Sequence, residues 1–342
     1  MHSLLKSYLS SRSQYIQVDN TKSSLCNVNV GVPQGSIISP LLFLLHINDL
    51  SNCSSFQVIN FADDTLLYHK VTDTTKCIEK YLNTEFIKVN NWMVSNKLKL
   101  NSSKTKFMIF TPNSPKFKFL NNIEIKTKDN TKLERVNECK YLGMVLDHKL
   151  NWQSHINYLI KKISKTVGIL YKTRQLLNKS SLMLILHSLL ISHLKYGILC
   201  YGRANKSALK PINVLFNRAI RCINFCKLRD KSTKDLYFDN RLLNLQNMFK
   251  LEVAKFCFRY VNGMLPESFD NILINTTSVH SHNTRNSQNF FQQRQLKKAG
   301  FDCLSHLGTK IWNQIPFHLK SETSFYFFGK KMKQHLILHP DS

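Results

Sequence analysis

The stretch FQVINFADDTLLY, residues 56–68, decides the fold of the first part of this chain. Its two halves favour β structure and meet at Asp63 and Asp64, so the pattern predicts a hairpin with both carboxylates at its tip. Adjacent carboxylates on a rigid turn suit hard divalent cations, and such a pair can help hold two metal ions for nucleotidyl transfer. Taken alone, Asp-Asp at a strand end is more often a solvated turn, because Asp tolerates turn geometry.

Three other segments accompany this hairpin in a fixed order. Upstream lies GVPQGSIISPLLF, residues 31–43, and downstream lie LKLNSSKTKFMIF, residues 98–110, and KYLGMVLD, residues 140–147. This order closely resembles the reverse transcriptases of non-LTR retrotransposons, the LINE and jockey-like group, over nearly the whole chain. Even SYLSSRSQ, residues 7–14, is similar to the segment that precedes the Pro-Gln-Gly motif in that group. Four ordered motifs are much more specific than one short motif.

The composition is strongly basic and points the same way. The 342 residues include 48 Lys and Arg against 21 Asp and Glu, a formal net charge of +27, which indicates a polyanionic partner, most simply nucleic acid. A solvated basic surface without a specific ligand is the alternative. It fits poorly, because residues 148–229 hold fifteen Lys and Arg and no Asp or Glu, whereas soluble surfaces usually mix both signs.

The expected fold class is α+β. The resemblance implies a partial polymerase palm, an antiparallel sheet with packed helices, followed by a mostly helical thumb and C-terminal region. We expect the partial palm over residues 1–148, a helical thumb-like region over 149–265 and a C-terminal helical extension over 266–342. A chain of this length is expected to hold two or three domains, and 43% hydrophobic residues exclude wholesale disorder.

Local patterns predict the elements of the first part. A helix is expected at residues 39–50, with Ser39 as N-cap and Pro40 at the first helical position, and another from Thr74 or Thr75 to Asn96. Residues 15–30 read as a hairpin with a polar turn. Further expected elements are a helix at 1–9 and strands at 104–110, 123–125 and 136–145.

The second part reads as helical throughout. Helices are expected over residues 151–178, 180–201, 207–225, 242–262, 304–312 and 324–338, with a polar loop at 275–288. The apolar run at residues 182–191 is shorter than the roughly 20 residues that a membrane span needs, so a buried helix is expected and no membrane contact.

The resemblance implies roles for the acids and for one lysine. Asp63 and Asp64 would be catalytic metal ligands, holding a pair of Mg²⁺ (or Mn²⁺) ions that polarise the α-phosphate and help activate the primer 3′-hydroxyl. Lys104 would neutralise or protonate the leaving pyrophosphate. A solvated strand-edge lysine is nearly as good an interpretation of Lys104. The motifs also imply that the acids lie near Gln34 and Gly35, with Lys104 on a neighbouring strand of the same sheet.

Two loops complete the implied site. The loop Pro33, Gln34, Gly35 and Ser36 would lie beside the nascent base pair, because glycine lets backbone approach a nucleotide and glutamine can hydrogen-bond to base or sugar edges. The alternative is a Pro-Gly turn before a helix. The segment Tyr141, Leu142 and Gly143 would form the hairpin that grips the primer end, and an ordinary strand with a glycine bulge is the alternative.

The basic helices would hold a nucleic-acid duplex by phosphate contacts that do not read sequence. The candidate contacts are Lys161, Lys162, Lys165, Lys172 and Arg174. The implied partners are an RNA template, a DNA primer and dNTP, in an intracellular, nuclear location. Residues 281–285 and 311–316 also resemble the C-terminal region of this group, without an assignable role, and Trp312 is expected to anchor a small helical core.

Some parts of the family polymerase are not matched. A third carboxylate on an upstream strand and the basic fingers residues that hold the triphosphate have no counterpart in these residues. The absent strand would leave a sheet edge unpaired. We therefore expect an incomplete reverse transcriptase fragment, from a decayed or mis-started reading frame. The alternative is a non-catalytic, basic nucleic-acid-binding remnant.

Overall fold

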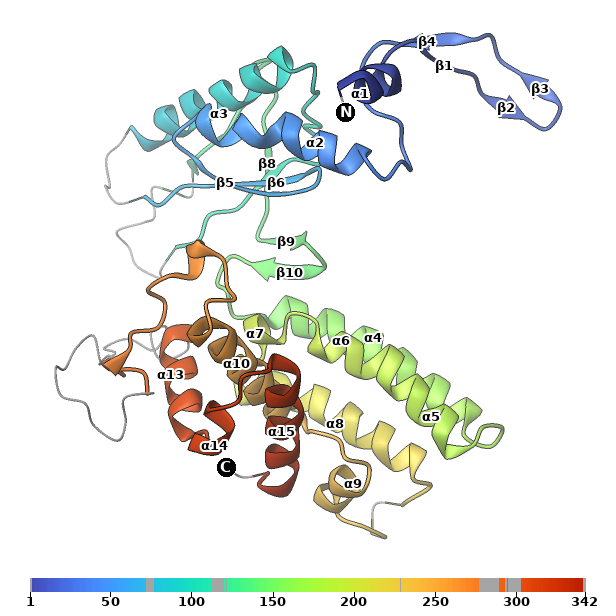
Figure 1. Ribbon diagram of the computed structural model, residues 1–342, viewed down its shortest axis with the longest axis vertical. Helices are drawn as coiled ribbons and strands as arrows, with labels where there is room; N and C mark the ends of the chain where they lie inside the picture. Colours follow the sequence, from blue (N-terminus) through green and yellow to red (C-terminus); the bar gives the residue numbers. More distant parts are fainter. Residues whose placement is uncertain are drawn as a thin grey trace. The chain divides into compact units, whose positions relative to one another are not determined.

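The computed structural model describes residues 2–71, 77–111, 120, 122–227, 229–276, 289–292, 294 and 303–340 (Figure 1). The chain forms two compact units, Met1–Asn137 and Glu138–Ser342. The first unit mixes short helices with small sheets, and the second is mainly helical. The α+β expectation is therefore confirmed in this general form. None of the helices in the described part of the chain is long and apolar enough to cross a bilayer.

The first unit opens with α1 (His2–Leu9) and a long hairpin arm, which Figure 1 shows as a narrow ribbon. β1 (Arg12–Gln14) pairs antiparallel with β4 (Cys26–Val28), and the arm continues as β2 (Gln17–Val18) and β3 (Thr21–Lys22). The predicted hairpin is confirmed, but its second strand already begins at Thr21, inside the expected turn. The turn is shorter because Asp19 adopts a left-handed φ of 51°, which lets the chain reverse within two residues.

The next helix, α2 (Ser39–Ile47), is confirmed, and the predicted Ser39 cap is wrong. Ser39 is the first helical residue, and the N-cap position belongs to Ile38 without a side-chain capping bond. The Ser39 hydroxyl donates instead to the Pro33 carbonyl and lies 2.9 Å from the Tyr8 hydroxyl. The Ser39 hydroxyl oxygen is therefore engaged with Pro33 and Tyr8 and does not cap the helix. The 3₁₀ helix η1 (Asn48–Asn52) continues α2.

The rest of the first unit is built around one central helix, α3 (Ile78–Ser95). The hairpin β5 (Gln57–Phe61) and β6 (Asp64–Tyr68) precedes it, and β7 (Lys106–Phe107) and β8 (Glu134–Arg135) follow. The predicted helix start at Thr74 or Thr75 lies outside the described residues. A buried cluster forms where these elements meet, and it contains Leu50, Phe56, Phe86, Val89 and Leu133.

The expected antiparallel sheet is only partly realised. The sheets formed by the described residues have two strands each, and β7 pairs with β8 in parallel. The strand predicted at residues 104–110 shrinks to Lys106–Phe107, and residues 123–125 form no strand. Within the part that the structure describes, β5 and β6 form a two-stranded sheet.

The second unit begins with a hairpin and continues as a helical assembly. The hairpin consists of β9 (Glu138–Tyr141) and β10 (Met144–Asp147). The helices are α4 (Gln153–Thr173), α5 (Lys179–Ile185), the π-helix η3 (Leu186–Ile191), α6 (Ser192–Lys195), α7 (Ile198–Tyr201), α8 (Lys206–Ile223), α9 (Thr233–Asp239), α10 (Leu245–Val261), η4 (Glu267–Phe269), α13 (Leu304–Gln314), α14 (Phe317–Lys320) and α15 (Phe325–Leu338).

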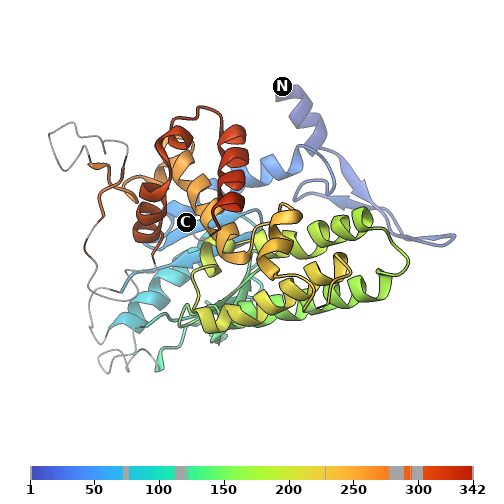
Figure 2. The ribbon, with the colours of Figure 1, turned by 90° about the horizontal axis from the view of Figure 1, so that it is seen from below.

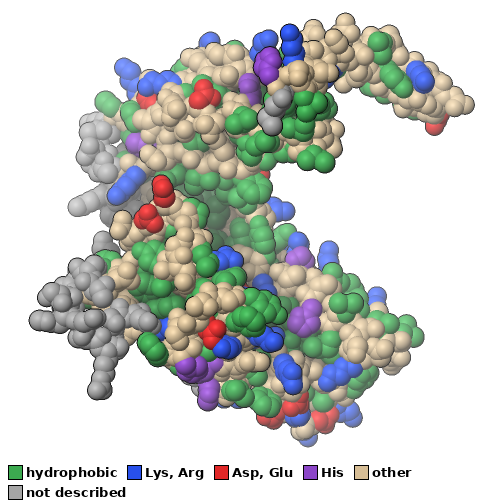
Figure 3. Space-filling model, viewed as in Figure 1, with side chains coloured by type: hydrophobic (Ala, Val, Ile, Leu, Met, Phe, Trp, Pro, Cys, Tyr) green, Lys and Arg blue, Asp and Glu red, His purple; other side chains and the backbone are tan. Residues whose placement is uncertain are grey.

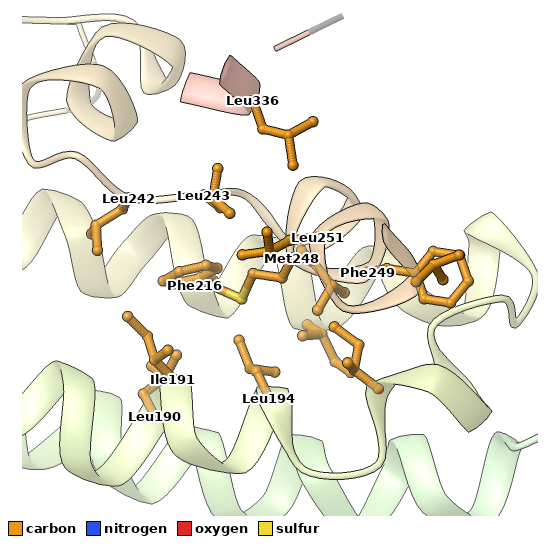
Figure 4. Close-up of a cluster of buried hydrophobic side chains, with 14 of the residues drawn as sticks. Leu190, Ile191, Leu194, Phe216, Leu242, Leu243, Met248, Phe249, Leu251 and Leu336 are labelled. Carbon is orange, nitrogen blue, oxygen red and sulfur yellow. The ribbon is translucent and has the colours of Figure 1, made fainter. Parts of the chain in front are cut away.

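These helices enclose one large apolar core. Figure 2 shows α4 and α8 side by side, and α10 packs against α13 and α15. Four leucines at four-residue spacing along α5, η3 and α6 are fully buried: Leu182, Leu186, Leu190 and Leu194. In Figure 4, Leu190, Ile191 and Leu194 face Phe216 and Met248 from the neighbouring helices. Burying one such side chain stabilises the fold by roughly 1.5–3 kcal/mol.

The helical predictions for the second unit are largely confirmed. The ranges predicted around α4, α8, α10, α13 and α15 agree with the structure to within a few residues, whereas residues 180–201 form a broken run rather than one helix. Trp312 is 2% exposed and packs near Phe290 and Phe328. Its predicted place in a helical core is therefore confirmed, but this core is the large one of the second unit and not a small one. Residues 281–285 lie outside the described part of the chain.

Candidate nucleic-acid and metal sites

The tip of the β5–β6 hairpin carries both candidate metal ligands. Phe61 pairs with Asp64, so the turn consists of Ala62 and Asp63 alone. Ala62 has a φ of 52°, a left-handed conformation typical of two-residue hairpin turns. Asp63 thus lies in the turn, Asp64 is the first residue of β6, and both are exposed. The prediction that the two acids lie at a hairpin tip is confirmed.

The two faces of this hairpin differ. Val58 and Leu67 are paired across the strands and pack into the cluster that contains Phe86 of α3. Ile59 and Phe61 lie on the opposite face, 49% and 61% exposed. Because residues paired across two strands share a face, Asp64 lies on this open side with Phe61. One face therefore anchors the hairpin, and the other offers a carboxylate beside an exposed ring.

The two carboxylates have the chemistry for a hard cation. Neither Asp63 nor Asp64 forms an ion pair with any residue that the structure describes. The described residues contain no cluster of three or more His, Cys, Asp or Glu side chains suited to a metal. A Mg²⁺ ion usually keeps several waters and takes only one or two carboxylates together with substrate phosphates. The donor set at the tip fits an ion bound in that way.

The Pro33–Ser36 loop has a backbone that only glycine accepts easily. Gly35 has a φ of +82°, and a Cβ placed there would have no atom within 4 Å. Gln34 and Gly35 are exposed, and the Ser36 hydroxyl accepts a bond from the Ile38 N–H. The bond from Ser39 to the Pro33 carbonyl ties the loop to the start of α2. An open glycine backbone and a free-standing glutamine amide are what close approach to a nucleotide requires.

The prediction that Lys104 lies on a strand in the sheet of the acids is wrong. Lys104 lies in a turn ahead of β7, and β7 is not part of the β5–β6 sheet. The physical reason is Asn101, whose side-chain oxygen accepts bonds from the Ser103 hydroxyl and the Lys104 N–H. Its carbonyl also accepts from Thr105. Such a side-chain-to-backbone network competes with strand pairing. The expected proximity of the acids to Gln34 and Gly35 stays a prediction.

Tyr141, Leu142 and Gly143 end β9 and form the turn of the β9–β10 hairpin. Leu142 and Gly143 have φ values of 43° and 77°, which is the condition for a type I′ two-residue turn. The alternative of a strand with a glycine bulge is therefore wrong. The structure instead places a tight, exposed hairpin tip at the motif.

Two residues that the sequence analysis missed hold this turn in place. The Tyr196 hydroxyl donates to the Leu142 carbonyl, and the Tyr196 ring lies 3.1 Å from the point where a Gly143 Cβ would be. Gly197, at a φ of +66°, lies so close to Met144 that a Cβ there would be 2.2 Å from its sulfur. A glycine inside an apolar helical run was the available signal, since it often marks a close backbone approach.

The same hairpin is joined to the start of α4 by polar contacts. The buried Asp147 carboxylate accepts the backbone N–H groups of Lys149, Asn151 and Trp152 at 2.8–3.2 Å. The Val145 N–H donates to Nδ1 of His155 at 3.3 Å. Burial lowers the pKa of His155 to about 4, so the ring stays neutral near pH 7. The hairpin and α4 therefore form one fixed local arrangement.

The predicted basic contacts do not all behave alike. Lys161, Lys165 and Lys172 are exposed along α4, whereas Arg174 lies over the Phe225 ring at 5.1 Å. Figure 3 shows Lys and Arg side chains scattered over the helical unit. A pocket of about 390 Å³ between α4 and α8, lined partly by Lys210 and Arg218, adds two further cations beside an apolar floor. The helical unit thus carries exposed cations on both α4 and α8.

Comparison with known proteins shows what the chain is similar to. Residues 1–146 match the family "Reverse transcriptase (RNA-dependent DNA polymerase)". The chain is 28% identical over 273 residues to the probable RNA-directed DNA polymerase from transposon X-element of Drosophila melanogaster, a match covering 75% of this chain and 28% of that protein. The corresponding protein from transposon BS is 28% identical over 277 residues, covering 75% of this chain and 29% of that protein.

A third relative belongs to the same group. The RNA-directed DNA polymerase from mobile element jockey of Drosophila melanogaster is 28% identical over 242 residues, covering 66% of this chain and 25% of that protein. The chain thus spans little more than a quarter of the length of these relatives. Because such matches exceed 146 residues, they also reach into the helical unit. Residues 1–146 are therefore similar to reverse transcriptases, and the longer matches are distantly similar to RNA-directed DNA polymerases of the jockey-like non-LTR retrotransposons.

Proposed function

We propose that the chain is a fragment of an RNA-directed DNA polymerase that holds a primer–template duplex. The observation that carries the proposal is the two-residue hairpin tip with Asp63 and Asp64, inside the residues that match the reverse transcriptase family. Reverse transcription joins a primer 3′-hydroxyl to the α-phosphate of a dNTP along an RNA template. An intracellular, nuclear location would accompany such a substrate.

Asp63 and Asp64 are the side chains that would hold Mg²⁺, or Mn²⁺ in its place. When bound, the ions would neutralise charge on the phosphates and favour the ionised 3′-hydroxyl. The hairpin's contribution is position: its Val58–Leu67 pair is fixed in the core of the first unit, so both carboxylates are held on a rigid strand end. Lys104, in its exposed turn, would neutralise the leaving pyrophosphate.

The two glycine turns would position the nucleic acid. The Pro33–Ser36 loop, with its open Gly35, would let a nucleotide approach the backbone, and Gln34 would bond to its polar edge. The Tyr141–Gly143 turn would support the primer end, since Tyr196 and Gly197 hold it in one conformation. In this proposal residues 1–148 act as part of a palm and residues 149–265 as a thumb, with a helical extension over residues 266–342.

The helical unit would bind the duplex backbone. Its first part, up to residue 229, is free of Asp and Glu from His148 onward, and its exposed lysines can neutralise phosphates without reading bases. A second candidate function, a non-catalytic nucleic-acid-binding protein, is favoured by one observation. The described residues offer two carboxylates at the tip and no larger ligand cluster.

A paired experiment tests both candidates. The purified chain is titrated with a labelled RNA–DNA duplex at rising salt, and dNTP incorporation is measured with Mg²⁺ or Mn²⁺. We expect binding that weakens steeply with salt and does not depend on base sequence, with incorporation no higher than that of Asp63→Asn. Salt-independent or sequence-dependent binding would refute the nucleic-acid role. Incorporation above the Asp63→Asn blank would instead favour the polymerase over the non-catalytic binding protein.

A further inference from the structure

Tyr158 lies between two lysines that come from different parts of the helical unit. The Lys162 ammonium, one helical turn further along α4, lies 4.8 Å from the centre of the Tyr158 ring. The Lys140 ammonium reaches it from β9 and lies 5.5 Å from the same centre. Both distances are within the range of cation–π contacts. Two lysines that are 22 positions apart in the sequence thus bring two positive charges to one phenol.

In the part of the chain that the structure describes, neither Lys140 nor Lys162 has a carboxylate partner. The sequence from residue 148 to 229 contains no Asp or Glu. Lysines elsewhere in the unit do form ion pairs, as Lys231 does with Asp239 and Lys255 with Glu252. Two like charges held together without a counterion repel each other, so an anion that bridges them would be bound favourably.

The titration behaviour of neighbouring groups agrees with a concentrated positive field. The pKa of Tyr158 is lowered, chiefly by hydrogen bonding to Lys162 and also by the charges of Lys162 and Lys140, against the opposing effect of burial. The pKa of His193 on α6 is lowered by burial and by Lys162. The basic groups that contact the Tyr158 ring are Lys140, Lys162 and His155, whose ring centre lies 6.1 Å away and which is neutral near pH 7. A negative charge is therefore stabilised at this place.

The arrangement is also fixed before any ligand binds. Lys140 directly precedes the Tyr141–Gly143 turn, and its hairpin is held against α4 through Asp147 and His155. The backbone positions of the β9 lysine and the α4 lysine are therefore set by buried contacts. A preorganised pair of cations loses less freedom on binding than two independent surface lysines do.

We propose that Lys140, Tyr158 and Lys162 form a discrete site for one backbone phosphate of the bound nucleic acid. The two ammonium groups would donate to the non-bridging phosphate oxygens, and the phenol O–H would donate a third bond. This inference rests on the proposed duplex binding and assigns a defined contact to it. It adds Lys140 and Tyr158 to the lysines already considered on α4, and it places a phosphate beside the primer-end turn.

The test compares charge removal at this site with charge removal elsewhere in the same unit. Binding of a labelled DNA duplex is measured across a salt series for Lys140→Gln, Lys162→Gln and the double variant, with Lys310→Gln, an exposed α13 lysine, as control. Because both lysines contact the same phosphate, the double variant should flatten the slope of log K against log salt by about 0.9, and each single variant should flatten it by part of that amount. At 0.1 M salt the double variant should weaken binding about eightfold, and each single variant should weaken it less. Lys310→Gln should bind like the unchanged chain.

The charge-preserving variants Lys140→Arg and Lys162→Arg keep the test valid if a glutamine variant folds poorly, because they should retain binding within about twofold. Equal binding by the double variant and Lys310→Gln would overturn the phosphate site while leaving the proposed duplex binding intact. Loss of duplex binding by the unchanged chain would instead refute the proposed function.

A second readout follows the phenol directly. The ring-labelled tyrosine signal that disappears in Tyr158→Phe identifies Tyr158 in NMR spectra, and its titration is recorded with and without duplex. Bound backbone phosphate should raise the pKa of Tyr158, because it neutralises the lysines that lower this pKa. A shift with inorganic phosphate or pyrophosphate at the same concentration, and none with duplex, would overturn the backbone assignment in favour of a free phosphate compound.

Discussion

Replacing Gly197 with alanine should loosen the β9–β10 hairpin from the helical unit. Gly197 has a φ of +66°, and a Cβ there would lie 2.2 Å from Sδ and 2.7 Å from Cε of Met144. The left-handed backbone alone costs an alanine about 1 kcal/mol. The clash involves the end of a flexible side chain, so Met144 can move aside, and overpacking of this kind adds about 1–2 kcal/mol. The expected total is about 2–3 kcal/mol.

Urea-induced unfolding of the full chain, followed by circular dichroism, measures this loss. With a slope of about 2 kcal/mol per molar urea, Gly197→Ala should lower the midpoint of the helical unit by about 1–1.5 M. Gly263→Ala is the matched control, because Gly263 has a φ of +62° and no atom would lie within 4 Å of its Cβ. The control should shift the midpoint by only about 0.5 M.

The Met144→Ala background separates the two contributions. There the steric part should vanish, and Gly197→Ala should lose only about 1 kcal/mol, the same as Gly263→Ala. If Gly197→Ala and Gly263→Ala destabilise the unchanged chain equally, then Met144 does not lie against Gly197, and the account of how the turn is held is refuted.

Three further predictions concern buried polar groups. His155 has a pKa of about 4 in the fold and about 6.5 when unfolded, so the unfolded chain binds more protons between these values. The helical unit should lose at most about 3 kcal/mol as the pH falls through this window, and His155→Phe should flatten that loss in urea unfolding. Asp147→Ala, which strips three backbone N–H groups of their acceptor, should cost about 2–4 kcal/mol by the same assay, with Asp147→Asn in between. Glu85, held near a pKa of about 2 by Lys88 and by the Ser55 N–H, stabilises the first unit above about pH 4.5. The stabilisation by Glu85 should decrease as the pH falls toward 2. If Glu85→Gln loses the same amount of stability over this pH range, Glu85 is not the cause of the loss.

The hairpin at residues 57–68 and the long helices could be predicted because their signals are local. Strand pairing at the tip follows from alternating β-favouring residues on either side of two acids, and α4 follows from apolar residues at helical spacing. The Lys104 turn also has a local cause, because asparagine side chains such as that of Asn101 hydrogen-bond to nearby backbone groups. At Lys104 the hydrogen bonds to Asn101 outweigh the β propensity of the residues that follow.

Other features depend on contacts between residues that are not neighbours in the sequence, so no local sequence pattern indicates them. The sequence around Ser39 is typical of a helix cap, but in the structure its hydroxyl contacts Pro33 and Tyr8 instead. Trp152 begins α4 at a φ of 66°, a conformation that the sequence gives no reason to expect. The Asp147 carboxylate makes this start possible by accepting the exposed N–H groups. Lys140 and Tyr158 could not be paired from sequence, because the pairing depends on how the hairpin docks on α4.

The π-helix η3 has a consequence for the phase of the helical run from Lys179 to Lys195. Four-residue steps on an α-helix turn by about 400°, so a leucine stripe at that spacing drifts about 40° with each step and about 120° from Leu182 to Leu194. The wider turn of a π-helix rotates less per residue and counteracts this drift. All four leucines can then face one core. The run therefore keeps residues that are four positions apart on one side of the helix. Removing one residue within Leu186–Ile191 would rotate His193 and Lys195 about the helix axis.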